Sequence, residues 1–142
     1  MFYSSLVKKA SLIAFAAHKD DVDNGGYPYV MHPFYLAFQM RDEASVCAAL
    51  LHDVIEDHAD EYSFEFLAAE GFPESVLAPL RLLTHDPSVP YMDYVKAIGE
   101  NPTARAVKFA DIALNLDATR VGGKPFYKTD LYREALSYLK SL

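Results

Sequence analysis

Four titratable side chains are crowded into six positions of an otherwise apolar segment: His52, Asp53, Glu56 and Asp57. If this segment is a helix, His52 shares one face with Glu56, and Asp53 shares the adjacent face with Asp57. All four groups could then look into one cleft while the apolar residues between them pack into the core. Burying such groups is costly unless a cation or hydrogen-bond partners satisfy them. A His-Asp pair alone is a weak signal, because acidic residues at a helix end more often form a solvated face.

Two other segments strengthen the interpretation. His32 lies between aromatic and proline residues at an expected helix start, and Asp111 interrupts an apolar segment that carries Asn115 one turn later on the same face. Two histidines and two aspartates from three helices are suitable ligands for one divalent metal. The mixed nitrogen and oxygen set fits manganese, iron or zinc, and the absence of thiolates disfavours a structural zinc site. Such a cation would lower the pKa of a bound water and make hydroxide available near neutral pH.

The elements that must position these groups are helices, because helical periodicity runs through almost the whole chain. We expect helices over residues 4–19, 32–40, 43–57, 63–70, 73–83, 91–98, 101–116 and 129–139. Ser63 and Asn101 are expected N-caps, Gly71 an expected helix end, and Thr129 or Asp130 the cap of the last helix. A loop is expected over residues 121–125, and no alternating β-branched run predicts a strand. The chain is therefore predicted to be one all-α domain, residues 1–142.

Composition narrows the function classes. The chain has 142 residues, 51% of them hydrophobic, and a net charge of −7, so it can form a core but offers no broad basic surface for a nucleic acid polymer. An anionic substrate must be received locally, by a cation or by a few basic residues such as Arg105 and Arg120.

The single cysteine, Cys47, cannot form an internal disulfide and lies in an apolar run, which suits a buried residue in a reducing cytosol. Residues 8–17 formally resemble a secretory signal but fit a core helix better, and no stretch approaches the about 18 apolar residues of a membrane span. We therefore expect a cytoplasmic protein without a membrane partner. The oligomeric state is left open.

Four segments, taken in order, resemble the hydrolase domain of the RelA/SpoT family, within the HD superfamily of metal-dependent phosphohydrolases. They are Ala17-His18, Pro-Tyr-Val-x-His-Pro at 28–33, Ala-Ala-Leu-Leu-His-Asp-Val-Ile-Glu-Asp at 48–57 and Val-Lys-x-Ala-Asp-x-x-x-Asn at 107–115, with further similarity at 131–136. The resemblance implies a compact helical HD-domain bundle and a manganese-dependent removal of the 3′-pyrophosphate from the alarmone (p)ppGpp of the stringent response. It describes a stand-alone guanosine 3′,5′-bis(diphosphate) 3′-pyrophosphohydrolase without a synthetase domain.

The resemblance also assigns roles by position. The metal ligands, with Mn²⁺ as the leading ion, would be His32, His52, Asp53 and Asp111. Glu56 and Asp57 would match the acidic pair that orients the nucleophilic water and handles protons. The nucleotide would contact Asn115 and Lys108, although Lys108 could instead snorkel from the helix surface.

The chain departs from the family pattern before the Pro-Tyr segment. Asp23 and Asn24 stand where alarmone hydrolases usually carry an Arg-Lys pair that helps to hold the nucleotide. Three interpretations are open: a solvated acidic turn, recognition of a nucleotide by Asp23 as a hydrogen-bond acceptor, or a calcium site that includes Asp21, Asp23 and Gly26. The substrate alternatives are NADPH 2′-phosphate or another nucleoside polyphosphate, and the non-enzymatic alternative is an HD module that only binds a nucleotide.

The remaining histidines and tyrosines are less informative. His18 matches the first-helix histidine of the family, for which a core or supporting role is favoured over ligation. His58 is a candidate helix C-cap, and His85 lies near the expected pocket. Tyr91 and Tyr94 fit core packing better than a nucleotide pocket.

Overall fold

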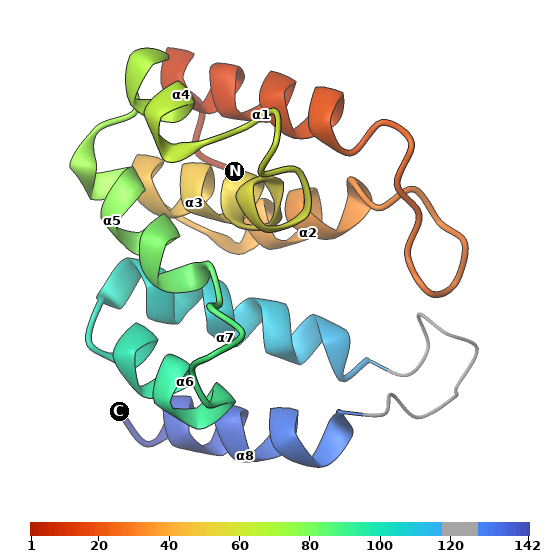
Figure 1. Ribbon diagram of the computed structural model, residues 1–142, viewed down its shortest axis with the longest axis vertical. Helices are drawn as coiled ribbons and strands as arrows, with labels where there is room; N and C mark the ends of the chain where they lie inside the picture. Colours follow the sequence, from red (N-terminus) through yellow and green to blue (C-terminus); the bar gives the residue numbers. More distant parts are fainter. Residues whose placement is uncertain (118–127) are drawn as a thin grey trace.

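The computed structural model describes residues 1–117 and 128–142, and this part of the chain is built from helices. They are α1 (Ser5–Ala17), α2 (Met31–Gln39), α3 (Glu43–Asp57), α4 (Phe64–Ala69), α5 (Glu74–Leu83), α6 (Tyr91–Gly99), α7 (Pro102–Asn115) and α8 (Thr129–Lys140) (Figure 1). The only extended pairing in the described residues is an isolated antiparallel bridge between Val22 and Pro28. The predicted all-α class is confirmed. The expected loop at 121–125 and Arg120 lie outside the described residues.

Helix α3 is the centre of the fold. Asp42 caps its N-terminus by accepting a hydrogen bond from the Ser45 backbone N–H. Ten of its fifteen residues are buried, because the helix packs against α1, α2, α5 and α7. A helix surrounded in this way must be apolar on nearly every face. A polar group in the middle of α3, such as His52, therefore faces other parts of the protein, while Glu56 and Asp57 at its C-terminal end are exposed.

The helices are stacked around this centre. In Figure 1, α1 lies above α2 and α3, α7 lies below them, and α6 and α8 cover the far side of α7, while α5 runs along one end from the upper to the lower half. Contacts link α3 to both α2 and α7, and α2 also contacts α7. The three helices that carry the expected metal ligands therefore meet one another.

The expected helix caps are present at α4 and α7 but not at α8. Ser63 accepts from the Phe66 N–H and Asn101 from the Ala104 N–H, as predicted. Gly71 follows α4 with a φ of 98°, a conformation that strains any residue with a Cβ. The prediction for α8 is wrong. Its N-cap is Lys128, without a side-chain cap bond, and Asp130 lies in the first turn, where its charge favours the positive end of the helix dipole.

Cys47 is fully buried within α3. Burial and the nearby Glu43 raise the pKa of its thiol to about 12, so the group stays protonated and unreactive near neutral pH. The expected role as a small buried hydrophobe agrees with this environment. Within the described residues, no helix has both the length and the apolar character that a bilayer crossing demands.

Candidate metal centre

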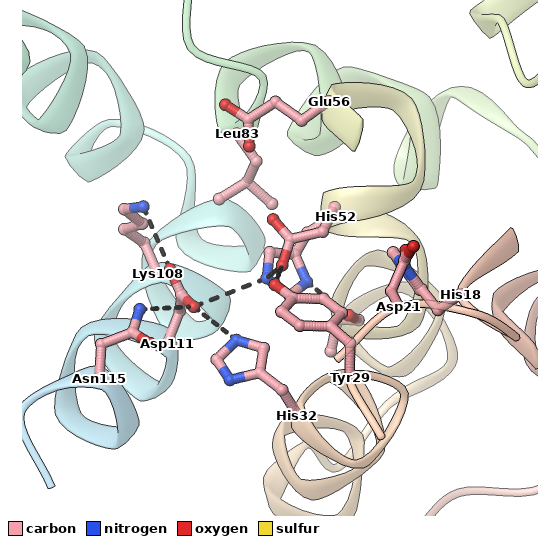
Figure 2. A network of polar contacts seen from close by, with 12 residues as sticks. His18, Asp21, Tyr29, His32, His52, Glu56, Leu83, Lys108, Asp111 and Asn115 are labelled. Atoms are coloured by element: carbon pink, nitrogen blue, oxygen red, sulfur yellow. Dashed lines mark hydrogen bonds and ion pairs between the residues drawn. The ribbon is translucent and has the colours of Figure 1, made fainter. Parts of the chain in front are cut away.

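The four expected metal ligands lie together where α2, α3 and α7 meet. His32, His52 and Asp53 offer ligand atoms within 4.8 Å of one another. Asp111 joins them from α7: its Oδ1 accepts from His32 Nε2 at 2.8 Å and lies 3.6 Å from His52 Nε2. We call these four candidate ligands the metal centre. Figure 2 shows His32 and His52 directed toward Asp111 from two different helices.

The backbone fixes the orientation and tautomer of His52. Its Nδ1 lies 2.7 Å from the carbonyl oxygen of Ala49. A carbonyl oxygen can only accept, so Nδ1 carries the hydrogen and Nε2 is the atom turned to the other ligands. Nε2 lies 3.0 Å from Asp53 Oδ2. A histidine held in this way, with one nitrogen donating to the backbone, has the arrangement common to metal-binding histidines.

Asp111 is the hub of the polar network on the α7 side. In addition to the hydrogen bond from His32, Asp111 Oδ1 accepts one from Asn115 Nδ2 at 3.3 Å, and Oδ2 accepts one from Lys108 Nζ at 3.1 Å. The Lys108 side chain is only 12% exposed and the Asp111 side chain 9%. The alternative that Lys108 snorkels from the helix surface is therefore wrong, because a carboxylate inside the protein satisfies its charge. Lys108 also lies over the rings of Tyr91 and Tyr94.

The electrostatics of the metal centre favour a cation. Burial alone would lower the pKa of His52, but Asp53 and Asp111 outweigh it and raise that pKa well above the usual range. Burial would raise the pKa of both carboxyl groups, yet neighbouring positive groups hold both pKa values low: His52 acts on Asp53, and Lys108, His32 and His52 act on Asp111. The site thus attracts positive charge to the Nε2 atom of His52.

The donor set of the metal centre suits a divalent metal ion. Two buried nitrogen atoms, His52 Nε2 and His32 Nδ1, have no hydrogen-bond partner of good geometry in the described part of the protein. His52 Nε2 faces two carboxylates, an arrangement that a proton or a metal ion stabilises. Two imidazoles and two carboxylates, with no thiolate, suit manganese, iron or zinc. The four residues of the metal centre are therefore suited to hold a divalent metal ion.

Tyr29 is a site residue that the sequence reasoning missed. Its hydroxyl donates to Asp53 Oδ2, and its ring stacks on His32 with 5.5 Å between centroids. Burial, followed by the charge of Asp53, raises the pKa of the hydroxyl far above its usual range, so Tyr29 stays a donor. Its place in the Pro-Tyr segment was visible in the sequence, but only the fold shows that the hydroxyl reaches a ligand. Tyr29 thus orients Asp53.

Glu56 and Asp57, the expected acidic pair, follow Asp53 on the last turn of α3, at the exposed end of the helix. Glu56 Oε1 accepts from the backbone N–H of His85 at 3.1 Å, which ties the end of α3 to the segment after α5. Burial raises the pKa of both carboxyl groups, and the charge of Asp53 raises both further. Groups with raised pKa values beside a metal site are suited to exchanging protons.

A cavity of about 310 Å³ opens beside His32. It is lined by Asp23, Tyr27, Met31, His32, Tyr35, Leu114 and Asp117. Asp23 Oδ1 accepts from the backbone N–H groups of Gly25 and Tyr27, at 2.8 and 3.0 Å, and so shapes the turn before α2. Asp23 therefore organises the turn, as the first interpretation expects, and it also lines a cavity beside His32, so recognition of a nucleotide by its carboxylate stays a prediction.

The calcium interpretation finds no support. The carboxylate of Asp21 does not join Asp23; its Oδ2 lies 2.9 Å from His18 Nδ1 and 2.6 Å from His58 Nε2. His58 is the C-cap of α3, as expected. His18 is fully buried and packs against Tyr29, in keeping with a supporting role.

The remaining candidates lie apart from the metal ligands. Tyr94 is a core residue whose hydroxyl donates to the Leu83 carbonyl at 2.6 Å, as the packing interpretation predicts. His85 stacks on Tyr94 with 4.4 Å between centroids. Arg105 lines a different cavity, of about 580 Å³, whose lining includes none of the metal-centre residues.

No family model matches the chain. Among curated proteins, 60 residues are 40% identical to the bifunctional (p)ppGpp synthase/hydrolase SpoT of Escherichia coli strain K12, and 56 residues are 38% identical to a GTP pyrophosphokinase of Myxococcus xanthus. These alignments cover 39% and 37% of this chain, and 8% and 7% of the relatives. The chain thus spans less than a tenth of the length of the curated relatives it matches.

A solved structure is similar to this chain over a larger part of its length than the curated sequences are. A metazoan ortholog of SpoT, which hydrolyzes ppGpp, superposes with a TM-score of 0.74 at 24% sequence identity, over 98% of this chain and 87% of that one. Over nearly its whole length the chain has the same fold as this SpoT ortholog. The resemblance to the RelA/SpoT family is confirmed by this fold and by the local sequence matches.

Proposed function

We propose that this chain is a metal-dependent phosphohydrolase that removes pyrophosphate from the 3′ position of guanosine 3′,5′-bis(diphosphate) or a closely related nucleotide. The observation that carries the proposal is the convergence of His32, His52, Asp53 and Asp111 from three helices of a SpoT-type fold. We propose manganese as the physiological ion. We place the enzyme in the cytoplasm, an assignment that a single buried cysteine suits.

The four ligands would hold the divalent ion, which lowers the pKa of a water molecule bound to it and neutralises phosphate charge. The protein's own part is to position the ligands. Ala49 holds the His52 ring so that Nε2 faces the other ligands, and Tyr29 keeps one oxygen of Asp53 in place. Lys108 and Asn115 do the same for Asp111. Held by these contacts, the ligands need little rearrangement when the ion binds.

Glu56 and Asp57 would handle the proton of the attacking water. Their carboxyl groups have raised pKa values and lie on the α3 turn that follows the ligands. The backbone N–H of His85 holds one oxygen of Glu56, so the other oxygen can accept a proton in a defined direction. A carboxylate placed in this way contributes typically about 10²–10⁴-fold to a hydrolysis rate.

The nucleoside part of the substrate would occupy the cavity beside His32, between Tyr27 and Tyr35. Tyrosine faces stack on any base, so they supply affinity without choosing the base. Asp23 can accept hydrogen bonds from a base or ribose but cannot donate to phosphate. We therefore propose that Lys108 and the metal ion supply the positive charge that the family's Arg-Lys pair supplies elsewhere.

A substrate panel tests the proposal. Purified protein with Mn²⁺ is incubated with ppGpp, NADPH and other nucleoside polyphosphates, and the release of pyrophosphate and phosphate is measured. Pyrophosphate release from ppGpp that is lost in Asp53→Ala and kept in Arg105→Gln is the expected result. If ppGpp stays intact while NADPH or another nucleotide is hydrolysed, the substrate assignment is wrong and the hydrolytic centre stands. If none is hydrolysed, the chain is a binding module.

A further inference from the structure

A second cluster of metal-type ligands lies on the other side of Tyr29 from Asp111. It comprises His18, Asp21 and His58, whose ligand atoms lie within 4.8 Å of one another. Asp21 Oδ2 is bracketed by His18 Nδ1 at 2.9 Å and His58 Nε2 at 2.6 Å. Figure 2 shows His18 and Asp21 to one side of Tyr29 and the Asp111 network to the other. None of these three residues belongs to the metal centre.

The cluster is held in place by its surroundings. The His18 side chain is fully buried, and its ring lies 5.0 Å from the Tyr29 ring and 5.5 Å, edge-on, from the His58 ring, measured between centroids. Packing on two sides therefore fixes the direction of Nδ1. The side chains of His58 and Asp21 are 25% and 32% exposed, so an ion can reach the cluster from solvent, and both groups can adjust to it.

The local field favours positive charge at this point. His18 is the C-cap of α1 and His58 is the C-cap of α3, so two helices direct their partly negative carbonyl ends at the cluster. Asp57 and Glu61 add to this field, since their charges act with Asp21 to raise the pKa of His58. A divalent cation placed between the two imidazoles and Asp21 would meet all of these groups at once.

We propose that His18, Asp21 and His58 form a second divalent-cation site, selective for zinc-like ions and distinct from the metal centre. Two imidazole nitrogens and one carboxylate oxygen, completed by water, make a common zinc ligand set. Imidazole also disfavours magnesium and calcium, which prefer oxygen ligands. Neighbouring ligands of a tetrahedral zinc ion lie about 3.4 Å apart, so Asp21 and His58 would move outward by less than about 1 Å.

The position of the site indicates a bracing role. It joins the end of α1 and the following turn to the end of α3. The same connection between α1 and α2 carries Tyr29, which packs on His18 and donates to Asp53. An ion bound at the second site would therefore hold the segment that orients a ligand of the metal centre, without contacting the substrate.

Metal counting tests the proposal on the full chain. Protein stripped with a chelator is dialysed against Zn²⁺, and bound zinc is measured by mass spectrometry. We expect two equivalents in the wild type and one fewer in His58→Gln and in Asp21→Asn. The chain has five histidines, of which His85 lies outside both sites, so His85→Gln is the matched control and should bind as much zinc as the wild type.

Two further measurements keep the result interpretable. Far-ultraviolet circular dichroism of the stripped variants checks that they are folded, and Asp53→Asn removes a ligand of the metal centre alone. If the metal centre is misassigned, the wild type and Asp53→Asn bind the same amount, but His58→Gln still binds one equivalent less. Zinc binding by folded His58→Gln and Asp21→Asn equal to that of the wild type would overturn the second site, and would show that Asp21 is held by hydrogen bonds alone.

Discussion

Removing the charge of Asp111 should destabilise the protein, because the buried ammonium group of Lys108 then loses its charged partner. The two side chains are 9% and 12% exposed, and Lys108 Nζ lies 3.1 Å from Asp111 Oδ2. Breaking a buried ion pair by removing one partner costs about 3–5 kcal/mol of unfolding free energy. At about 2–4 °C per kcal/mol for a domain near this size, Asp111→Asn should lower the melting temperature by roughly 6–20 °C.

The double variant shows whether the stranded charge is the cause. Lys108→Met removes the ammonium group and keeps the apolar stem, so Asp111→Asn with Lys108→Met should be more stable than Asp111→Asn alone by at least about 1 kcal/mol. The assay is urea unfolding of stripped protein in the presence of a chelator, so that metal binding does not contribute to the difference. Arg81→Met is the control, since it breaks an ion pair with Glu74 whose side chains are 49% and 70% exposed, and a surface pair of this kind contributes little to stability.

Additivity would refute this reasoning. If the effects of the two single substitutions sum to that of the double variant within about 0.5 kcal/mol, Lys108 and Asp111 do not stabilise each other. A loss below about 1 kcal/mol for Asp111→Asn would contradict it equally, because it would mean that Lys108 finds water or another partner once the carboxylate is gone.

Three other predictions concern the surroundings of the metal centre. Tyr29→Phe keeps the ring but removes the donor to Asp53, so Mn²⁺ affinity measured by calorimetry should fall by about 10–100-fold; an unchanged affinity would show that the hydroxyl does not orient the ligand. Burial and Asp53 raise the pKa of Asp57, and its carboxyl group must be deprotonated to accept a proton. Activity should therefore rise with pH through a value above the ordinary aspartate pKa, and a pH–rate profile that is flat down to the ordinary pKa would contradict the assignment. In protein stripped of metal, Asp21 raises the pKa of His58. The stabilising contribution of protonated His58 is therefore complete below its pKa of about 6.5 in the unfolded chain, and it is lost as the pH rises through the higher pKa of the folded protein. His58→Gln should therefore lose stability relative to wild type below that window and little above it, as chemical denaturation across pH can measure; an equal loss at every pH would show that His58 acts through packing.

The sequence was sufficient for the features that depend on periodicity and order along the chain. The bounds of helix α3 agree with the expected helix over 43–57, because a long apolar run with helical periodicity marks it in the sequence. His32, His52, Asp53 and Asp111 could be named because each lies at an expected helical position in apolar surroundings. Their approach to one another follows from the packing of α2, α3 and α7, which the resemblance implied but the spacing alone did not.

Contacts made by the connection between α1 and α2 could not be predicted. Whether Tyr29 reaches Asp53, and whether Asp21 faces His18 and His58 or Asp23, depends on the path of a turn that has no periodicity. Lys108 was ambiguous for another reason: a lysine three residues before a buried aspartate on a helix can pair with it or extend to solvent, and only the packing of α6 and its tyrosines over the ammonium group decides between them.

The proposed function is hydrolysis of the 3′-pyrophosphate of ppGpp at the metal centre. The direct measurement is the product distribution from ppGpp, separated by anion-exchange chromatography, as stripped protein is loaded with increasing Mn²⁺. We expect GDP and pyrophosphate in equal amounts, at a rate that rises with metal occupancy and is abolished in His52→Gln. Intact ppGpp at full manganese occupancy, or turnover that His52→Gln retains, would contradict it.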